Sequence, residues 1–253
     1  MATEPAIGVI GGMGPYAGLD LVRKIFDQTR ASRDQDHLPV TLLSFPHRIP
    51  DRSTFLFDET QPTPIPALTD LARQLDAMGA TVAGIPCNTA HAPAIFGAVC
   101  EALDASGHQI RLLNMIEEAV RFAREQIPGL ERIGVLSTLA VYRLCMYQTT
   151  IEATGFEAVM PDEDVEINLV NQTIFDDTWG IKAKANPVTT QARQNLLKAI
   201  AHLREKGAEA VILGCTELPL AISEPEVDGV LMIDPTRVLA RALIRETYPD
   251  KLL

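Results

Sequence analysis

Residues 81–91, which read TVAGIPCNTAH, and residues 210–219, which read AVILGCTELP, decide the fold of this chain. Each segment opens with a short apolar run, as is typical of a strand buried in a parallel sheet. Each run ends just before a cysteine, Cys87 or Cys215, whose neighbours are mostly small or polar. In open parallel sheets, ligands bind beyond the carboxyl ends of the strands. Both cysteines are therefore expected where a ligand can reach them.

The two segments mark two halves of the chain that repeat each other. A Gly-Ala pair precedes each of the two cysteines by the same distance. Upstream, the run IGVIGG at residues 7–12 corresponds to IGVLST at residues 133–138, and downstream LLNMI at 112–116 corresponds to LMIDP at 231–235. Three matches in the same order indicate a duplicated α/β unit, and alternation of strands with helices predicts parallel sheets.

Between the strands, apolar residues recur at helical spacing and predict amphipathic helices. Their expected apolar faces carry Leu19, Val22, Ile25 and Phe26 in one helix, Leu68, Leu71 and Leu75 in the next, and Leu196, Leu197, Ile200 and Leu203 in a later one. Residues 44–64 form a long polar stretch between these elements. Stretches of this length are typical of lids or binding loops.

The expected architecture is α/β, with two pseudosymmetric lobes that each contain a parallel sheet. We assign residues 1–115 and the C-terminal segment 228–253 to the first lobe, and residues 116–227 to the second. The helix expected at residues 236–248 would then pack back on the first lobe. A pseudo-twofold axis between the lobes would place the two cysteines opposite each other, so the active site is expected in the cleft between the lobes.

Composition argues against several classes of function. The 253 residues carry a net charge of −11 without a cluster of basic residues, so neither nucleic acid nor an anionic membrane is an expected partner. No apolar stretch reaches the roughly 18 residues needed to span a bilayer, and no signal sequence is recognisable. A reducing cytoplasmic location with free cysteines is expected. The cysteine and histidine spacings predict no metal site, and the glycine-rich residues 11–14 lack the spacing of a nucleotide-binding loop, so no cofactor is expected.

The pair of cysteines at equivalent positions predicts acid–base chemistry. A free cysteine is usually a buried packing residue, and Cys100 and Cys145 are interpreted in that way. Inversion of a stereocentre needs a base on one face of a carbon and an acid on the other, and the thiols of Cys87 and Cys215 can exchange these roles. Backbone N–H groups at a strand-to-helix turn can lower a thiol pKa from about 8.5 toward neutrality.

Residues close to the strand ends are candidate substrate contacts. They are Met13 in the glycine-rich loop, Asn88 and Thr89 after the first cysteine, Thr138 after the strand at residues 133–136, and Thr216 and Glu217 after the second cysteine. His91, four residues after Cys87, could tune the thiol or make a structural hydrogen bond. Glu217 could instead hold its own loop together.

These motifs resemble the aspartate/glutamate racemase superfamily, and within it the aspartate racemase branch. The segments that carry the resemblance span nearly the whole chain in the expected order, at residues 11–15, 49–52, 86–91, 180–182 and 214–218. Glutamate racemases of peptidoglycan synthesis typically carry Gly-Cys-Thr-His at the second cysteine, where this chain has Glu217. The resemblance implies Rossmann-like lobes, a homodimer and cofactor-independent 1,1-proton transfer on a free acidic amino acid, aspartate or glutamate.

The resemblance also implies roles for single residues. The two cysteines match the catalytic cysteines of the family. Arg52 matches an arginine that receives a substrate carboxylate, and Lys182 matches a lysine in the same role. A dicarboxylate substrate has two negative groups, so two cationic contacts suit it. An arginine can bind a carboxylate through two parallel hydrogen bonds. Arg48 is the alternative to Arg52, and Lys184 is the alternative to Lys182, because each lies close by in sequence.

Departures from the family pattern leave the substrate open. Residues 139–141 read LAV where many members have a second threonine after Thr138, and Gly18 stands where a threonine is common. The presence of two cysteines argues against relatives with a single cysteine, such as the arylmalonate decarboxylases. Two other functions remain as alternatives: an enzyme like maleate isomerase that works through a cysteine adduct, and a catalytically inactive relative that binds a small ligand.

Overall fold

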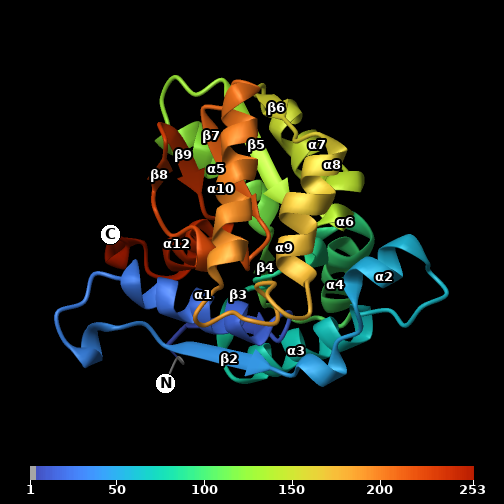
Figure 1. Ribbon diagram of the computed structural model, residues 1–253. Coiled ribbons are helices and arrows are strands. Elements are labelled where there is room, and N and C mark those ends of the chain that lie inside the picture. Colours follow the sequence, from blue (N-terminus) through green and yellow to red (C-terminus); the bar gives the residue numbers. More distant parts are fainter. Residues whose placement is uncertain (1–3) are drawn as a thin grey trace. The chain divides into compact units, whose positions relative to one another are not determined.

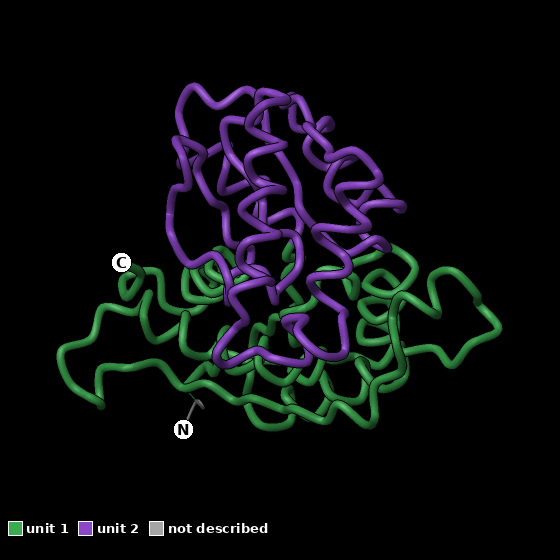
Figure 2. Tube along the Cα trace, in the orientation of Figure 1, with its two compact units in different colours: residues 1–115, 236–253 green, residues 116–235 purple. Residues whose placement is uncertain are grey.

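Two sheets of mostly parallel strands organise the chain in the computed structural model, which describes residues 4–253 (Figure 1). One unit contains the chain up to Met115 together with Thr236–Leu253, and the other contains Ile116–Pro235 (Figure 2). The predicted α/β class with two such lobes is confirmed.

The first unit contains a four-stranded parallel sheet in the order β2-β1-β3-β4. Its strands are β1 (Ala6–Gly11), β2 (Val40–Ser44), β3 (Ala80–Gly84) and β4 (Arg111–Leu113). Its α-helices are α1 (Pro15–Asp27), α2 (Arg52–Phe57), α3 (Ile65–Ala77), α4 (Pro93–Ala105) and, from Thr236 onward, α12 (Pro235–Thr247). Short 3-10 turns complete it, namely η1 (Asp34–Asp36), η2 (Pro46–Arg48), η3 (Asn88–His91) and η5 (Pro249–Lys251).

The second unit contains a five-stranded sheet in the order β6-β5-β7-β9-β8, in which only β8 runs antiparallel to its neighbour. Its strands are β5 (Arg132–Ser137), β6 (Glu157–Val159), β7 (Ala210–Gly214), β8 (Glu226–Val227) and β9 (Val230–Ile233). Its helices are α5 (Met115–Gln126), α6 (Leu139–Arg143), α7 (Met146–Ala153), α8 (Glu163–Val165), the π-helical turn η4 (Glu166–Asn171), α9 (Gln172–Phe175), α10 (Thr190–Glu205) and α11 (Leu218–Ala221).

The boundary expected at residue 228 needs correction. Residues 228–235 belong to the second unit. The physical reason is that β9 pairs with β7, with Ile233 opposite Ile212, so this strand completes the second sheet.

Strand register demonstrates the duplication residue by residue. The order β2-β1-β3-β4 corresponds to β6-β5-β7-β9. In the first sheet Ile7 pairs with Val82, and in the second Ile133 pairs with Ala210. Counted from these two partners, Cys87 and Cys215 both come five residues later, since 87 − 82 and 215 − 210 are equal.

Two glycines of the first strands are packed alike in both units. A Cβ on Gly8 would lie 3.0 Å from Leu75 Cδ1 and 3.2 Å from Ala80 Cβ. A Cβ on Gly134 would lie 3.0 Å from Leu203 Cδ1 and 3.0 Å from Ala208 Cβ. In both units a helix leucine and an alanine at or just before the start of the third strand therefore pack directly on the backbone of the first strand.

Two expectations about the first unit are wrong in detail. The buried residues of α1 are Ala17, Gly18, Asp20, Leu21 and Ile25. Leu19 and Phe26, expected on the buried face, are 56% and 37% exposed. The stretch at residues 44–64, expected as one long loop, contains η2 and α2.

Each unit has a helix that follows a strand of the other. Helix α5 follows β4 but belongs to the second unit, and α12 follows β9 but packs in the core of the first. In that core Leu239 and Leu243 contact the cluster that contains Ile7 and Val82. Neither half of the sequence taken alone therefore corresponds to a complete unit.

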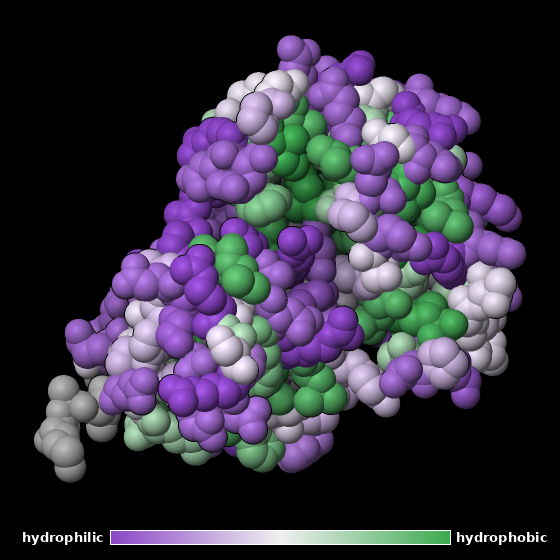
Figure 3. All heavy atoms as spheres, turned by 90° about the vertical axis from the view of Figure 1, so that its left-hand side faces the viewer, coloured by the Kyte–Doolittle hydropathy of each residue, from purple (hydrophilic) through white to green (hydrophobic). Residues whose placement is uncertain are grey.

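On the face shown in Figure 3, hydrophobic residues form separate areas among hydrophilic ones. None of the helices within residues 4–253 is both long enough and apolar enough to cross a membrane.

Candidate active site

Cys87 lies in the connection between β3 and α4. Its backbone is extended, with φ −158°, and its side chain is only 6% exposed. The η3 turn follows, in which Ala90 N–H donates to Cys87 O at 3.1 Å. Helix α4 then begins with Pro93, a residue suited to the first turn of a helix. The sequence PCNTAH thus forms a tight strand-to-helix connection with the thiol at its start.

Other candidates of the first unit lie around this turn. Asn88 and Thr89 are buried within η3, and Met13 is buried in the same hydrophobic cluster as Cys87. Arg52 is the first residue of α2, a helix that lies beside η3. Its guanidinium donates to Pro50 O at 3.3 Å. The structure therefore brings Met13, Arg52, Asn88 and Thr89 to the Cys87 region.

The glycine-rich loop that carries Met13 requires glycine at one position. Gly12 has φ +99°, a conformation that side-chain-bearing residues rarely adopt. A Cβ there would also lie 3.1 Å from the backbone nitrogen of Pro46. The loop therefore packs closely on the segment after β2, which fixes Met13 in place.

Arg48, the alternative to Arg52, is engaged elsewhere. Its guanidinium forms an ion pair with Asp70 of α3. Asp51 caps α2 by accepting the Thr54 N–H at 2.8 Å, which orients the first turn of the helix that Arg52 opens. The structure therefore favours Arg52 over Arg48 as the cation of this region.

Cys215 directly follows β7 and is 4% exposed. Leu218 N–H donates to Cys215 O at 3.0 Å, which matches the bond from Ala90 to Cys87 in the first unit. Thr138 lies at the end of the neighbouring strand, because Ser137 pairs with Gly214. Its hydroxyl caps α6 by accepting the Val141 N–H at 3.4 Å.

A chain of polar contacts runs through Glu217. The Cys215 thiol donates to Glu217 Oε2 at 2.9 Å, and the Thr216 hydroxyl donates to the same oxygen at 3.2 Å. On the other oxygen, the Lys182 ammonium donates to Oε1 at 2.6 Å. Lys182 Nζ also lies 5.6 Å from the ring centre of Phe175. The structure thus brings Lys182, Thr216 and Glu217 together beside Cys215, with Lys182 reaching it through Glu217.

Burial dominates the electrostatics at the second cysteine. Burial, and then the negative charge of Glu217, raise the pKa of the Cys215 thiol well above its ordinary value. The backbone N–H of Glu217 in the turn lowers this pKa, as expected, but burial and the Glu217 charge outweigh it, so the pKa does not move toward neutrality. Burial would also raise the pKa of Glu217, but the charge of Lys182 and hydrogen bonds from Cys215, Lys182 and Thr216 hold it below the ordinary value. The resting arrangement is therefore a thiol beside a carboxylate.

Two further residues near this strand end escaped the sequence analysis. Tyr147 of α7 is fully buried, and a Cβ on Gly214 would lie 2.9 Å from its ring. Burial, Asp234 and Cys215 raise the pKa of its phenol well above the usual value. Glu166 is fully buried in η4, and burial raises its pKa to about 8, opposed by the backbone of Ser137. Neither residue belongs to a motif, so no sequence signal pointed to them.

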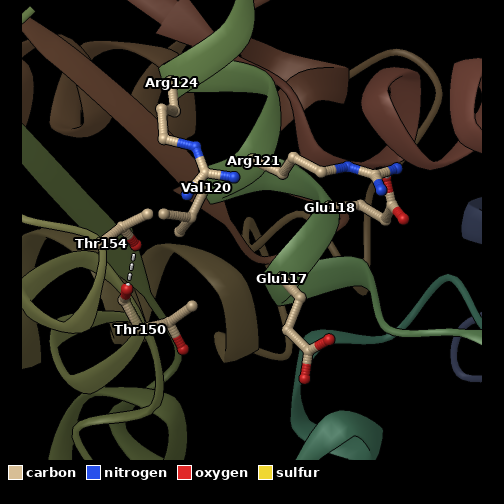
Figure 4. Close-up of a pocket in the computed structure, with 7 residues that line it drawn as sticks. All are labelled: Glu117, Glu118, Val120, Arg121, Arg124, Thr150 and Thr154. Atoms are coloured by element: carbon tan, nitrogen blue, oxygen red, sulfur yellow. Dashed lines mark hydrogen bonds and ion pairs between the residues drawn. The ribbon is translucent and has the colours of Figure 1, made fainter.

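A surface hollow between α5 and α7 is a separate feature of the second unit (Figure 4). It is lined by Glu117, Glu118, Val120, Arg121, Arg124, Thr150 and Thr154. Arg121 pairs with Glu118, and the two threonine hydroxyls donate to helix carbonyls. None of these residues is among the predicted site residues. Within residues 4–253, no group of three or more His, Cys, Asp or Glu side chains is arranged to hold a metal ion.

Comparisons with known proteins agree on one family. The sequence profile of the family described as Asp/Glu/Hydantoin racemase matches residues 10–243. A broad specificity amino-acid racemase, RacX of Bacillus subtilis (strain 168), is 25% identical over 247 residues, which cover 96% of this chain and 97% of the relative.

Solved structures share the fold over almost the whole chain. The aspartate racemase of Picrophilus torridus superposes with a TM-score of 0.77 at 28% identity, covering 98% of this chain and 96% of that one. An aspartate racemase homologue from Pyrococcus horikoshii OT3 superposes with a TM-score of 0.73 at 24% identity, covering 96% of this chain and 98% of that one. The second similarity concerns the fold alone.

Proposed function

Because the chain belongs to the Asp/Glu/hydantoin racemase family, we propose that it is an amino-acid racemase that inverts aspartate or glutamate without a cofactor, through Cys87 and Cys215. The observation that supports this proposal most strongly is the register equivalence of the two cysteines, each just beyond the same strand of its own sheet. A packing role alone gives no reason for a thiol at both positions.

In the proposed reaction, one thiolate removes the α-proton of the substrate and forms an S–H bond while the Cα–H bond breaks. The opposite thiol donates its own proton to the other face of the carbanion, so the stereocentre is inverted. The two sulfurs have then exchanged protonation states, and the next turnover runs in the reverse direction or follows proton exchange with solvent.

Cys215 suits the donor role at the start of one direction, because its raised pKa keeps the thiol protonated. In the other direction Cys215 begins as the thiolate, the state that it reaches when it gives its proton to the carbanion. The Glu217 carboxylate, whose Oε2 lies 2.9 Å from the sulfur, disfavours this thiolate, and the charge of Lys182 favours it. Glu217 is therefore proposed to hold the hydrogen of the Cys215 thiol in the protonated state.

The proposed substrate contacts divide between the units. In the first, Arg52 would bind one substrate carboxylate through its guanidinium, close to Met13, Asn88 and Thr89. In the second, Thr138, Thr216 and Lys182 are the proposed contacts. Lys182 already pairs with Glu217, so a substrate carboxylate would share its ammonium with that side chain. The name of the Bacillus relative, a broad specificity racemase, supports including amino acids other than aspartate and glutamate in the substrate panel.

The test is proton NMR in D₂O with L-aspartate and L-glutamate in separate reactions, followed by chiral chromatography of the products. We expect loss of the α-proton signal together with formation of the D-enantiomer. Cys87→Ser and Cys215→Ser should each slow racemisation by at least about 100-fold, the usual scale of acid–base catalysis.

Cys145, interpreted from the sequence as a buried packing residue, is exposed in the structure and lies outside the predicted site. Cys145→Ser is therefore the matched control, and it should racemise at the wild-type rate. Full racemisation by both single variants would contradict the proposal. A stable covalent adduct on one cysteine, seen by intact mass with maleate, would instead favour the isomerase alternative.

A further inference from the structure

One backbone carbonyl beside Cys87 receives two donors. Ile85 O accepts the Cys87 N–H at 2.8 Å and also lies 3.0 Å from His91 Nε2. A carbonyl oxygen can only accept, so Nε2 must carry the ring hydrogen. The His91 side chain therefore donates a hydrogen bond to Ile85, the residue before Pro86. This bond links the end of the turn to its beginning.

The His91 ring is held firmly and carries no charge. It is 3% exposed, and its centre lies 4.8 Å from that of Phe96 in α4. Burial lowers its pKa to about 4, opposed by the bond to Ile85, so the imidazole is neutral at physiological pH. A neutral ring whose proton is already bonded to a carbonyl is a poor acid or base toward substrate, which leaves a role in geometry.

The second unit has no equivalent of this contact. The bond from Ala90 to Cys87 recurs as the bond from Leu218 to Cys215. Equivalent residues of these two turns differ by 128 in number. Pro219 is therefore the equivalent of His91, because 219 − 91 is 128. Proline has no side-chain donor, and the second turn is held through Glu217 instead. A loss of the histidine bond would therefore disturb one thiol and leave the other in place.

We propose that His91 is a positioning residue for Cys87, which fixes the direction of this thiol through the shared carbonyl of Ile85. This inference rests on the proposed racemase function for its kinetic consequence. A base displaced by about 1 Å can lose on the order of 100-fold in rate.

The decisive variant is His91→Phe, which keeps a flat ring of similar size but removes the donor, and His91→Gln is its conservative partner, whose amide nitrogen can reach the same carbonyl. Each enantiomer of the substrate is incubated in D₂O with these variants, wild type and Cys87→Ser. We expect His91→Phe to slow inversion by about 10- to 100-fold, and His91→Gln to restore most of the rate.

The kinetic signature is a difference between enantiomers. The enantiomer whose proton Cys215 removes should still exchange its α-proton with solvent faster than it inverts, whereas the other should neither exchange nor invert at an appreciable rate. Cys87→Ser should give the same pattern. Equal slowing of exchange for both enantiomers by His91→Phe, or unchanged inversion, would overturn the proposal.

A second measurement does not depend on racemase activity. Peptide mapping after timed alkylation gives the labelling rates of Cys87 and Cys215 separately. We expect His91→Phe to raise the rate at Cys87 several-fold without changing it at Cys215, and His91→Gln to restore it. An unchanged rate at Cys87 would refute the positioning role even if the protein racemises no amino acid, so failure of this inference and failure of the proposed function remain distinguishable.

Discussion

At the scale of single residues, burial sets the protonation of the ionisable side chains near the second cysteine. Cys215 shows this clearly: a turn of this type can favour a thiolate, yet burial and the charge of Glu217 keep the thiol protonated.

Burial also shifts the pKa of Glu166, and this shift leads to a prediction about pH. It is fully buried in η4, and burial raises its pKa from 4.5 to about 8. Between these two values the unfolded chain releases the proton while the folded protein keeps it. The free energy of unfolding should therefore decrease as pH rises from about 4.5 to about 8, by on the order of 3–5 kcal/mol from this residue alone.

The Glu166→Gln variant should remove this loss. We expect its free energy of unfolding, measured by urea denaturation, to be similar to that of wild type near pH 5 and higher near pH 8. Asp164→Asn is the control, because it removes a carboxylate from an exposed position two residues away. A difference between Glu166→Gln and wild type that does not grow with pH would show that Glu166 is ionised in the folded protein.

The two cysteines could be predicted as site residues because a duplicated spacing is visible in the sequence. Their protonation could not, because it depends on neighbours brought together by folding.

At the scale of elements, the strands were easier to predict than the faces of the helices. β3 and β7 are buried apolar runs, and a run of this kind at a fixed distance from a Gly-Ala pair indicates a strand directly. In α1, by contrast, large apolar residues suggested the wrong face. The buried side includes Ala17 and Gly18, because the helix lies too close to β1 for larger side chains. Periodicity of large residues does not reveal such close backbone packing.

The close approach of α1 to β1 can be tested with a pair of glycine substitutions. A Cβ on Gly18 would lie 3.2 Å from Gly11 Cα and 3.2 Å from a Leu42 methyl carbon. Gly18→Ala should lower the free energy of unfolding by about 1–3 kcal/mol, since the gain in helix propensity does not offset overpacking against a backbone. The change should appear as a lower midpoint in urea denaturation.

Gly97 in α4 provides the matched control. No atom lies within 4 Å of the position of its added Cβ, apart from the residues of its own turn. Gly97→Ala should therefore raise the free energy of unfolding by roughly 0.5–1 kcal/mol, the propensity gain alone. Stabilisation by both substitutions would mean that α1 can move away from β1 at little cost.

At the scale of the whole molecule, the duplication predicts two lobes, and the helix at residues 236–248 is expected to pack back on the first of them. The structure places α12, at the end of the chain, in the core that contains β1 and β3. The second unit, by contrast, builds its main core from residues between Leu136 and Val230. The sequence did not reveal that β9 completes the second sheet, because its pairing with β7 depends on the folded arrangement and not on order along the chain.

This arrangement predicts that a destabilising substitution in α12 increases hydrogen exchange in strands near the N-terminal end of the sequence. Leu243 and Leu196 are both fully buried leucines, the first in the core of the first unit and the second in that of the second. Each Leu→Ala change should cost about 2–5 kcal/mol. Hydrogen exchange measured by mass spectrometry on the full chain should show faster exchange in β1 and β3 for Leu243→Ala, and in β5 and β7 for Leu196→Ala. The prediction is strong because β1 lies more than 200 residues from Leu243 in sequence. If Leu243→Ala accelerated exchange in β7 as much as in β1, the two units would unfold as a single cooperative body, and their separate cores would not set local stability.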